Sequence, residues 1–360
     1  MLLIEIHTSN FRNLENQRVA LSPHTTVLFG QNGHGKTNFL EACYLLCTLR
    51  PLRAQKLAEL VRLGTQDPAL VQGRFELPGG VRTVEVEIGP QGRQARLDGK
   101  TVRDPDELFG GLATVAFTPD DLAVVKEGPD GRRRMLDRAV QNRHPSHLSD
   151  ARDYLRALRS RNQLLRERAG PELLAAFDEP LARVGARIRQ RRAEVLAELL
   201  PHAQRAFTEV AQGEADLRLR PTVEDLSEQA LRQALEDRLR RDSERGFTSV
   251  GPHADDVAIF IGDKPARLYA SQGQSRAVVL AFRIGEIENL REKQGRSPLL
   301  LLDDVSSELD PDRNAFLMSY LAQLSGQVVL TTTDRDLVAK STAENSLFQR
   351  VSTGRIDVEK

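Results

Sequence analysis

Residues 30–37 combine the residue types and the spacing that a phosphate-binding site needs. They read Gly-Gln-Asn-Gly-His-Gly-Lys-Thr and match the pattern G-x-x-x-x-G-K-[ST] at every fixed position. Glycines tolerate positive φ, so successive N–H groups can turn inward around phosphate oxygens. Lys36 adds a mobile charge for the β and γ phosphates, and Thr37 offers a hydroxyl to Mg²⁺. This stretch predicts a loop that binds ATP.

The sequence on either side of this loop suits it. Residues 25–29 are apolar and β-branched, as in a buried strand, and residues 38–49 are typical of a helix. The alternative is an ordinary glycine turn before a helix, and the full match makes that the weaker interpretation. The expected ATP contacts are Gly30, Gln31, Asn32, Gly33, His34, Gly35, Lys36, Thr37 and Asn38.

Two carboxylates could complete the site. Asp303 and Asp304 directly follow the apolar run 299–302. In a Walker B strand, one such carboxylate serves the Mg²⁺ shell and the second serves the attacking water. We therefore expect Lys36, Asp303 and Asp304 to be catalytic and Thr37 and Asp303 to hold Mg²⁺. Taken alone, the pattern also fits a buried strand with an acidic turn.

Composition limits the class of protein. Lys and Arg total 51, and Asp and Glu also total 51, so attraction to nucleic acid must come from local patches. The two cysteines, Cys43 and Cys47, are spaced i, i+4 and lack the C-x-x-C spacing of a redox or metal pair, so we expect them to be small buried apolar residues. The start of the chain lacks a basic signal region, and no apolar run reaches membrane-span length. These features favour a reduced, cytoplasmic protein without a membrane span.

The order of the predicted elements gives an α/β fold. We expect strands at 2–6, 18–21, 71–77, 81–88, 94–97, 111–117, 247–250, 257–261, 299–302 and 328–332, in addition to 25–29. We expect further helices at 135–142, 147–168, 180–200, 227–241, 276–291 and 312–324. Far more sequence separates Lys36 from Asp303 than a compact nucleotide domain needs. The predicted domains are an ATPase part with a β-rich lobe (1–118), an inserted helical domain (119–245) and a second ATPase part (246–360).

A third motif resembles the ABC signature. Ser271, Gln272, Gly273 and Gln274 stand at the start of a predicted helix, where a serine cap and a glycine can form an anion site. In most proteins this would be a capped helix and nothing more. Walker B follows, and then a stretch from Ser307 to Asp310 that matches the D-loop. This order indicates an ABC-type ATPase head in which the four signature residues contact ATP.

Several motifs resemble the RecF family, in the SMC-like branch of the ABC ATPases. They are Phe11-Arg12-Asn13, residues 118–126, Arg132-Arg133-Arg134, residues 248–253, residues 271–274 and Asp303-Asp304, which together span nearly the whole chain. The resemblance implies a DNA-repair ATPase that binds double-stranded and gapped DNA, forms an ATP-dependent homodimer, and helps load recombinase with RecR and RecO. It also implies that Arg12 lies close to the nucleotide, where it either contacts a phosphate or packs near the loop, and we expect the contact.

Three positions depart from the wider ABC pattern. Asp304 replaces the usual catalytic glutamate, Asp120 replaces the Q-loop glutamine, and Thr333 replaces the switch histidine before Asp334. A shorter carboxylate and a missing histidine suggest slow hydrolysis. We therefore expect a weak ATPase whose slow hydrolysis serves timing. We also expect DNA to stimulate this hydrolysis.

A charged segment could contact DNA. Residues 131–170 hold eleven arginines and four acidic residues. Such a run is usually a solvated helical face. In a chain that resembles RecF, Arg132, Arg133 and Arg134 become candidates for phosphate contacts that read no sequence.

Two other classes stay open on the sequence. One is the ATPase motor of a membrane transporter, which would not be expected to carry an arginine-rich insert. The other is a structural clamp that binds nucleotide without hydrolysing it. ATP hydrolysis stimulated by DNA would separate the repair ATPase from both.

Overall fold

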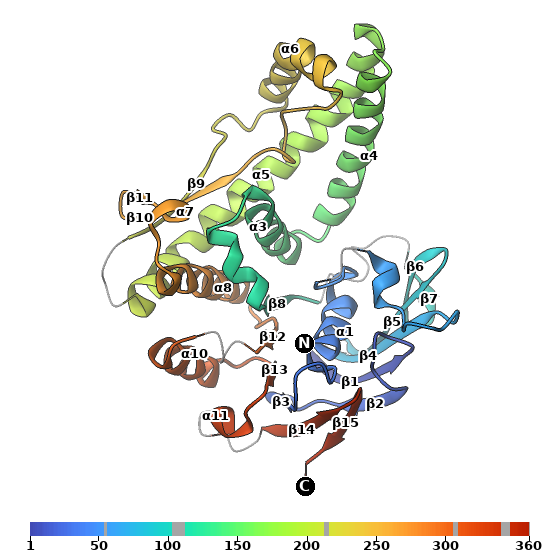
Figure 1. The fold of residues 1–360 in the computed structure, drawn as a ribbon, viewed down its shortest axis with the longest axis vertical. Coiled ribbons are helices and arrows are strands. Elements are labelled where there is room, and N and C mark those ends of the chain that lie inside the picture. The colour runs from blue at the N-terminus through green and yellow to red at the C-terminus, as the bar shows by residue number, and fades with distance from the viewer. Residues whose placement is uncertain (54–55, 103–111, 212–215, 305–308, 340–345, 360) are drawn as a thin grey trace. The chain divides into compact units, whose positions relative to one another are not determined.

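The computed structural model describes residues 1–53, 56–102, 112–211, 216–304, 309–339 and 346–359 (Figure 1). These residues form two compact units: residues 1–122 with 286–360, and residues 123–285. The first unit is thus assembled from both ends of the chain, and the second is a continuous insertion. Each described helix is too short or too polar to cross a membrane.

A six-stranded sheet forms the nucleotide half of the first unit. Its order is β15 (Arg355–Val358), β14 (Leu347–Ser352), β3 (Thr25–Phe29), β13 (Val328–Thr332), β12 (Leu299–Asp303) and β8 (Thr114–Phe117). All neighbours are parallel except β14 and β15, which form a hairpin. Every residue of β12 and β13 is buried, as expected for strands covered on both faces. The carboxyl ends of β3, β13 and β12 therefore meet along one edge of the sheet.

The β-rich lobe is a second sheet, and it is antiparallel. Its order is β2 (Gln17–Ala20), β1 (Leu2–Ser9), β4 (Ala69–Leu77), β5 (Gly80–Gly89), β6 (Gly92–Leu97) and β7 (Lys100–Thr101). The strands expected at 71–77, 81–88 and 94–97 form an antiparallel meander, and β1 joins it by pairing with both β2 and β4. Buried Gln327 ties the two sheets: its side-chain amide bonds to the N–H and carbonyl of Leu3 and to the carbonyl of Ser22.

Helix α1 (Lys36–Thr48) contacts both sheets of the first unit. Eleven of its thirteen residues are buried, so it is apolar on nearly all sides. Cys43 and Cys47 lie in this core as free thiols. Burial raises the pKa of Cys43 and raises the pKa of Cys47 to about 12, so both stay protonated. Their predicted role as small apolar core residues is confirmed.

The remaining elements of the first unit are short or peripheral. They are the 3₁₀ helix η1 (Leu57–Leu60) and the helices α10 (Pro311–Gln323) and α11 (Arg335–Ala339). The 3₁₀ helix η2 (Pro119–Val125) and α8 (Gln272–Gln294) each contain a boundary between the two units. Residue 111 of the expected strand 111–117 lies outside the described ranges.

The second unit is mainly helical. Its helices are α3 (Pro129–Arg143), α4 (His147–Arg166), α5 (Pro171–Val210), α6 (Glu228–Arg245) and the short α7 (Ala266–Tyr269), joined by a sheet of β9 (Leu217–Pro221), β10 (Val257–Ile261) and β11 (Lys264–Pro265). Its core includes Tyr154, Leu158, Leu181, Ala182, Ile188, Leu231 and Leu235. Helix α5 has 40 residues and runs through Pro180 and Pro201, well beyond the expected range 180–200.

Two expectations for this unit need correction. Residues 247–250 do not form a strand, because side chains take up the backbone groups there: Thr248 N–H donates to Asn162 Oδ1 and Ser249 N–H donates to Asp242 Oδ1. The compact unit also continues past residue 245, to residue 285. The reason is that β10 pairs with β9 in antiparallel register, which keeps residues 257–261 with the helices.

Candidate functional site

The glycine loop between β3 and α1 has the backbone that phosphate binding requires. Gly30, Gly33 and Gly35 have φ values of 153°, 80° and 112°. A Cβ atom at Gly30 would lie 2.3 Å from the carbonyl oxygen of Val351, and one at Gly35 would lie 2.9 Å from Asn13 Oδ1. Gly35 is also the N-cap of α1 and has no side chain with which to cap it. The first N–H groups of α1 are therefore left for an anion.

Lys36 is folded across its own loop. Its buried ammonium donates to the carbonyl oxygens of Gly30 at 2.7 Å and Gln31 at 3.0 Å. Burial lowers the pKa of Lys36, against the opposing effect of the Asp304 and Asp303 carboxylates. A bound phosphate would offer this charge stronger acceptors than two carbonyls.

Thr37 and Asp303 meet as the sequence predicts. Thr37 Oγ1 donates to Asp303 Oδ1 at 2.7 Å, and Thr331 Oγ1 on β13 donates to the same oxygen at 3.0 Å. The hydroxyl of Thr331 also accepts the N–H of Asp304 at 2.9 Å. Asp304 stands in a left-handed turn with φ of 48° and is half-buried. One threonine of β13 therefore holds both Walker B residues, Asp303 through its carboxylate and Asp304 through its backbone N–H.

These oxygens fit Mg²⁺. A hydroxyl and a carboxylate oxygen 2.7 Å apart are hard ligands, and Mg²⁺ in nucleotide sites takes few protein ligands because phosphates and waters supply the rest. Among the described residues there is no cluster of three or more His, Cys, Asp or Glu side chains that could hold a metal ion.

Arg53 belongs to the site, although the sequence analysis missed it. Its guanidinium lies 3.5 Å from Asp303 Oδ2 and 3.4 Å from Asp120 Oδ2, and its backbone N–H donates to Glu41 Oε1 at 3.0 Å. Asp120 stands at the expected Q-loop position, so this arginine joins that position to Walker B. Its side chain is 39% exposed and remains accessible to a ligand. No local pattern marks it, because its partners are far away in the sequence.

Residues 12 and 13 support the loop and its helix. The Arg12 guanidinium pairs with the buried carboxylate of Glu41 at 2.7 Å, which ties the end of β1 to α1. Asn13 Nδ2 donates to the carbonyl of Gly33 at 3.2 Å, and Asn13 Oδ1 accepts from Asn38 Nδ2 at 2.7 Å. Arg12 is thus engaged with Glu41, and its contact with nucleotide stays a prediction.

The signature segment lies in the second unit. Ser271 caps α8: its hydroxyl accepts the N–H of Gln274 at 3.1 Å, and its own N–H donates to Gln274 Oε1 at 2.9 Å. This reciprocal pair is a capping box. Lys126 donates to the carbonyl of Ala270, just before the serine. Ser271 and Gln272 are exposed, and Gly273 is half-exposed.

The structure describes the remaining predicted site residues, with one exception. Ser307 of the D-loop lies outside the described residues. Asp310 is the N-cap of α10 and accepts the N–H of Arg313 at 3.1 Å. Gln31 and Asn32 are exposed on the loop, His34 is half-buried, and Thr333 is exposed after β13.

Arg132, Arg133 and Arg134 do not form the phosphate-contacting patch that we expected. Arg132 is 5% exposed and binds Asp256 with two hydrogen bonds of 2.8 Å, while its third nitrogen donates to the carbonyls of Val124 and Glu127. The guanidinium of Arg133 binds the carbonyl of Asp255 and the carboxylate of Asp130. Of the three, only Arg134 is exposed.

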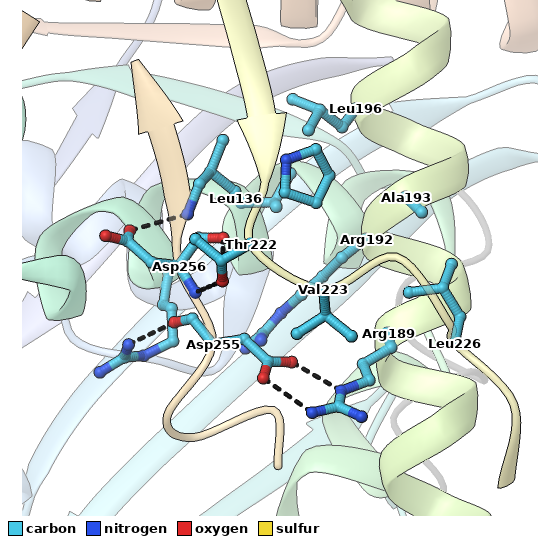
Figure 2. A pocket seen from close by; sticks show the side chains of 13 residues that line it. Leu136, Arg189, Arg192, Ala193, Leu196, Thr222, Val223, Leu226, Asp255 and Asp256 are labelled. Carbon is cyan, nitrogen blue, oxygen red and sulfur yellow. Dashed lines mark hydrogen bonds and ion pairs between the residues drawn. The ribbon is translucent and has the colours of Figure 1, made fainter. Parts of the chain in front are cut away.

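Arg132 and Arg133 are neutralised by acidic residues that lie outside residues 131–170, namely Asp256 and Asp130. Burial disfavours the Asp256 carboxylate, but the hydrogen bonds and charge of Arg132 outweigh it and hold the pKa of Asp256 below its usual value. Figure 2 shows the neighbouring pocket, where Asp255 accepts two hydrogen bonds from Arg189, at 2.7 and 2.8 Å. Arg192 in the same lining binds both oxygens of Asp137. The paired charges and the apolar side chains between them argue against a phosphate site in this pocket.

A different set of arginines faces solvent. Along α4 and at its end, Arg152, Arg156, Arg159 and Arg166 are all exposed. Their spacing of i, i+4, i+7 and i+14 places them on one helical face. We call these four residues the arginine stripe. Asp153 approaches Arg152 and Arg156 at 3.5 and 3.6 Å, which are weak contacts for exposed groups.

Fold and site together define a P-loop nucleotide-binding head. The model of the family described as RecF/RecN/SMC N terminal domain matches residues 2–354. The DNA replication and repair protein RecF of Anaeromyxobacter dehalogenans strain 2CP-C is 54% identical, over 98% of each chain. The RecF protein of Trichlorobacter lovleyi is 37% identical over 100% of this chain and 99% of its own. The chain therefore belongs to the RecF family within the RecF/RecN/SMC group.

Solved structures agree with this assignment. A structure of the recombination mediator protein RecF-ATPrS in the RecFOR pathway matches with a TM-score of 0.89 and 31% identity, over 99% of this chain and 98% of that one. An SMC head bound to the C-winged helix domain of ScpA matches with a TM-score of 0.58 at 15% identity, over 100% of this chain and 97% of that one. The second likeness shows the fold alone, which is that of an ABC-type ATPase head.

The contacts of Arg132 predict that it acts in stability. Arg132→Met should lower the free energy of unfolding by about 2–3 kcal/mol, because it leaves the partly buried Asp256 without its partner. Arg134→Met, the same change at the exposed neighbour, should stay within about 0.5 kcal/mol of the wild type. Urea unfolding followed by circular dichroism measures both. Equal unfolding curves for the two variants would contradict the structural role.

Proposed function

We propose that the chain is an ATP-dependent DNA-binding protein of recombinational repair and replication, with a weak ATPase activity. The observation that carries the proposal is the meeting of Thr37 with Asp303, which completes a nucleotide site in a chain that matches RecF proteins along nearly its whole length. A place in the cytoplasm and association with RecR and RecO are parts of the same proposal. They rest on the family and on the RecFOR pathway named for the solved relative.

The geometry supports specific roles in ATP binding. The glycine loop and the uncapped start of α1 would enclose the phosphates, and Lys36 would exchange two carbonyl acceptors for β and γ phosphate oxygens. Thr37 and Asp303 would hold Mg²⁺, which neutralises charge on the phosphates when bound. Asp304, fixed through Thr331, would orient and deprotonate the attacking water.

Slow hydrolysis follows from residue types at this site. Asp304 is one methylene shorter than the usual glutamate, and Thr333 cannot supply the proton chemistry of a switch histidine. Slow turnover suits a protein that must stay assembled on DNA for a time. The competing role as a transporter motor loses its support because the family match covers residues 2–354, which include the insertion.

We further propose that ATP joins two copies of the chain head to tail. The exposed N-terminus of α8 presents the Ser271 hydroxyl and the dipole of a long helix, a combination that attracts phosphate. In ABC heads the signature of one copy contacts the γ phosphate held by the other. The γ phosphate would then supply the differential binding energy for dimerisation, and hydrolysis would remove it.

The DNA surface is assigned to the arginine stripe. Four exposed arginines on one face can follow a phosphate backbone without reading bases. The stripe replaces residues 132–134 as the proposed DNA surface, because the guanidinium groups of Arg132 and Arg133 already bind carboxylates and carbonyls of the second unit. Of residues 132–134, only Arg134 remains a candidate for a phosphate contact.

The role of Asp304 predicts a specific kinetic defect. Asp304→Asn should lower ATP hydrolysis by about 10²–10⁴-fold, because the amide cannot accept the proton of water. ATP binding should persist, since the loop and Lys36 are untouched. The same replacement at exposed Asp312 on α10 should leave hydrolysis unchanged. Phosphate release and equilibrium binding measure the two properties. Full turnover by Asp304→Asn would exclude it as the base.

The role of Ser271 predicts an assembly defect. Ser271→Arg should abolish ATP-dependent dimerisation and leave nucleotide binding by each monomer intact. Ser227→Arg is the matched control: Ser227 caps α6 through the N–H of Ala230, also at 3.1 Å, so both variants lose a cap worth about 1 kcal/mol. Sedimentation with ATP and Mg²⁺ separates them. Dimerisation by Ser271→Arg would reduce this serine to a helix cap.

The arginine stripe predicts a change in the salt dependence of DNA binding. Arg156→Glu with Arg159→Glu should weaken duplex binding and reduce the slope of log K against log salt by about 2, one for each lost phosphate contact. Arg238→Glu with Arg241→Glu is the control, because both residues are exposed at the same spacing on α6. Fluorescence anisotropy at several salt concentrations measures the slopes. The same slope in both double variants would place DNA on another surface.

A further inference from the structure

The turn of the C-terminal hairpin lies against the phosphate loop. Strands β14 and β15 are joined by Thr353 and Gly354, whose φ values are 47° and 88°. Positive φ at both central residues is the signature of a type I′ hairpin turn. Outside this turn, Ser352 pairs with Arg355. The hairpin is therefore a tight, regular unit whose turn has a fixed shape.

Gly354 joins this turn to the loop and to the N-terminal segment. Its N–H donates to the carbonyl of His34 at 2.8 Å. Its carbonyl accepts the N–H of Glu15 at 3.0 Å and the side-chain amide of Gln17 at 2.7 Å. Gln17 in turn accepts the N–H of Ile356 at 2.9 Å. Both backbone groups of Gly354 are thus engaged, one of them by the phosphate loop.

This bond constrains the direction of a phosphate donor. The peptide bond is planar and trans, so the carbonyl of His34 and the N–H of Gly35 point in opposite directions. When Gly354 fixes that carbonyl, it fixes the N–H of Gly35 facing away from the hairpin. Asn13 does the same one peptide earlier, since it binds the carbonyl of Gly33 and thereby directs the N–H of His34.

The same hairpin also touches the start of the loop. A Cβ at Gly30 would lie 2.3 Å from the carbonyl oxygen of Val351 on β14, so the two backbones are in direct contact there. The guanidinium of Arg350 lies 5.5 Å from the ring centre of Phe29, the residue before the loop. The hairpin therefore contacts the loop at Gly30 and again at His34.

We infer that Gly354 is a positioning residue of the nucleotide site, which holds the N–H groups of the phosphate loop in the orientation that binds phosphate. The inference rests on the proposed ATP-binding function and extends it to a residue outside every nucleotide motif of the chain. Glycine is required for a steric reason as well as for its φ: a Cβ at this position would lie 2.0 Å from the carbonyl oxygen of Asn13. Both atoms belong to or adjoin the backbone, so the turn itself must move.

The chain contains a matched control for this residue. Asp98 and Gly99 join β6 to β7 with φ values of 50° and 79°, nearly those of Thr353 and Gly354. A Cβ at Gly99 would meet no atom within 4 Å. Alanine at either glycine has the same unfavourable backbone conformation. Only the alanine at position 354 would move a turn away from the phosphate loop.

The experiment measures binding of a non-hydrolysable ATP analogue with Mg²⁺ by calorimetry, at a temperature where circular dichroism shows each variant to be folded. Gly354→Ala should raise Kd by about tenfold or more, because the charge-assisted hydrogen bond from the N–H of Gly35 to phosphate loses its geometry. Gly99→Ala should bind like the wild type. A purely structural role would lower the melting temperature of both variants without changing the affinity of the folded protein.

Each possible result either supports or overturns the positioning role of Gly354. Wild-type affinity in folded Gly354→Ala overturns the inference. If Gly354→Ala does not fold, Gln17→Met replaces it, since this change removes both side-chain bonds that anchor the turn; a raised Kd then supports the inference and an unchanged Kd overturns it. If the wild type and Gly99→Ala both fail to bind, the proposed nucleotide function falls and the positioning role falls with it.

Discussion

The hydrogen bond between Thr37 and Asp303 joins the two ends of the chain in one site, and the sheet order makes it possible. Strand β13 lies between β3 and β12, so the strand ends that carry the loop and the carboxylate are two strand spacings, about 10 Å, apart. The loop and the first turn of α1 span that distance. Thr331 on the middle strand completes the connection, because it binds Asp303 and also the N–H of Asp304. The parallel arrangement of these three strands is the constraint on which the remaining geometry depends.

Those parts of the site that depend on local pattern could be predicted from the sequence. Glycine spacing fixes the backbone of residues 30–37, and an unbroken apolar run specifies a buried strand at 299–302, whatever packs around them. Element boundaries were less predictable. Helix α5 continues through Pro180 and Pro201 because its contacts with α3, α4, α6 and β9 outweigh the local cost of proline. Strand β9 shows the alternation Leu-Arg-Leu-Arg over only a few residues, which is a weak signal by itself.

What could not be predicted depends on partners that lie far away in the sequence. The sequence suggested Arg132 as a phosphate contact, but Asp256, 124 positions later, pairs with its guanidinium. Arg53 reaches Asp303 across 250 positions. Gly354 meets the phosphate loop only because β14 pairs with β3. In each case the residue type is unremarkable, and the function follows from which segment the fold brings beside it.

The pairing of β3 has a consequence for the order in which the protein forms during synthesis. Both neighbours of this strand, β13 and β14, come from residues after 327, so the strand that carries the phosphate loop has two open edges while most of the chain is being made. Residues 123–285 are continuous and can complete their own core before the ribosome has released the rest. Such non-local closure slows folding and leaves β-strand edges open to wrong pairing. We therefore expect chaperones that recognise exposed β-strands to bind the newly synthesised part of the first unit until β13 and β14 have been made.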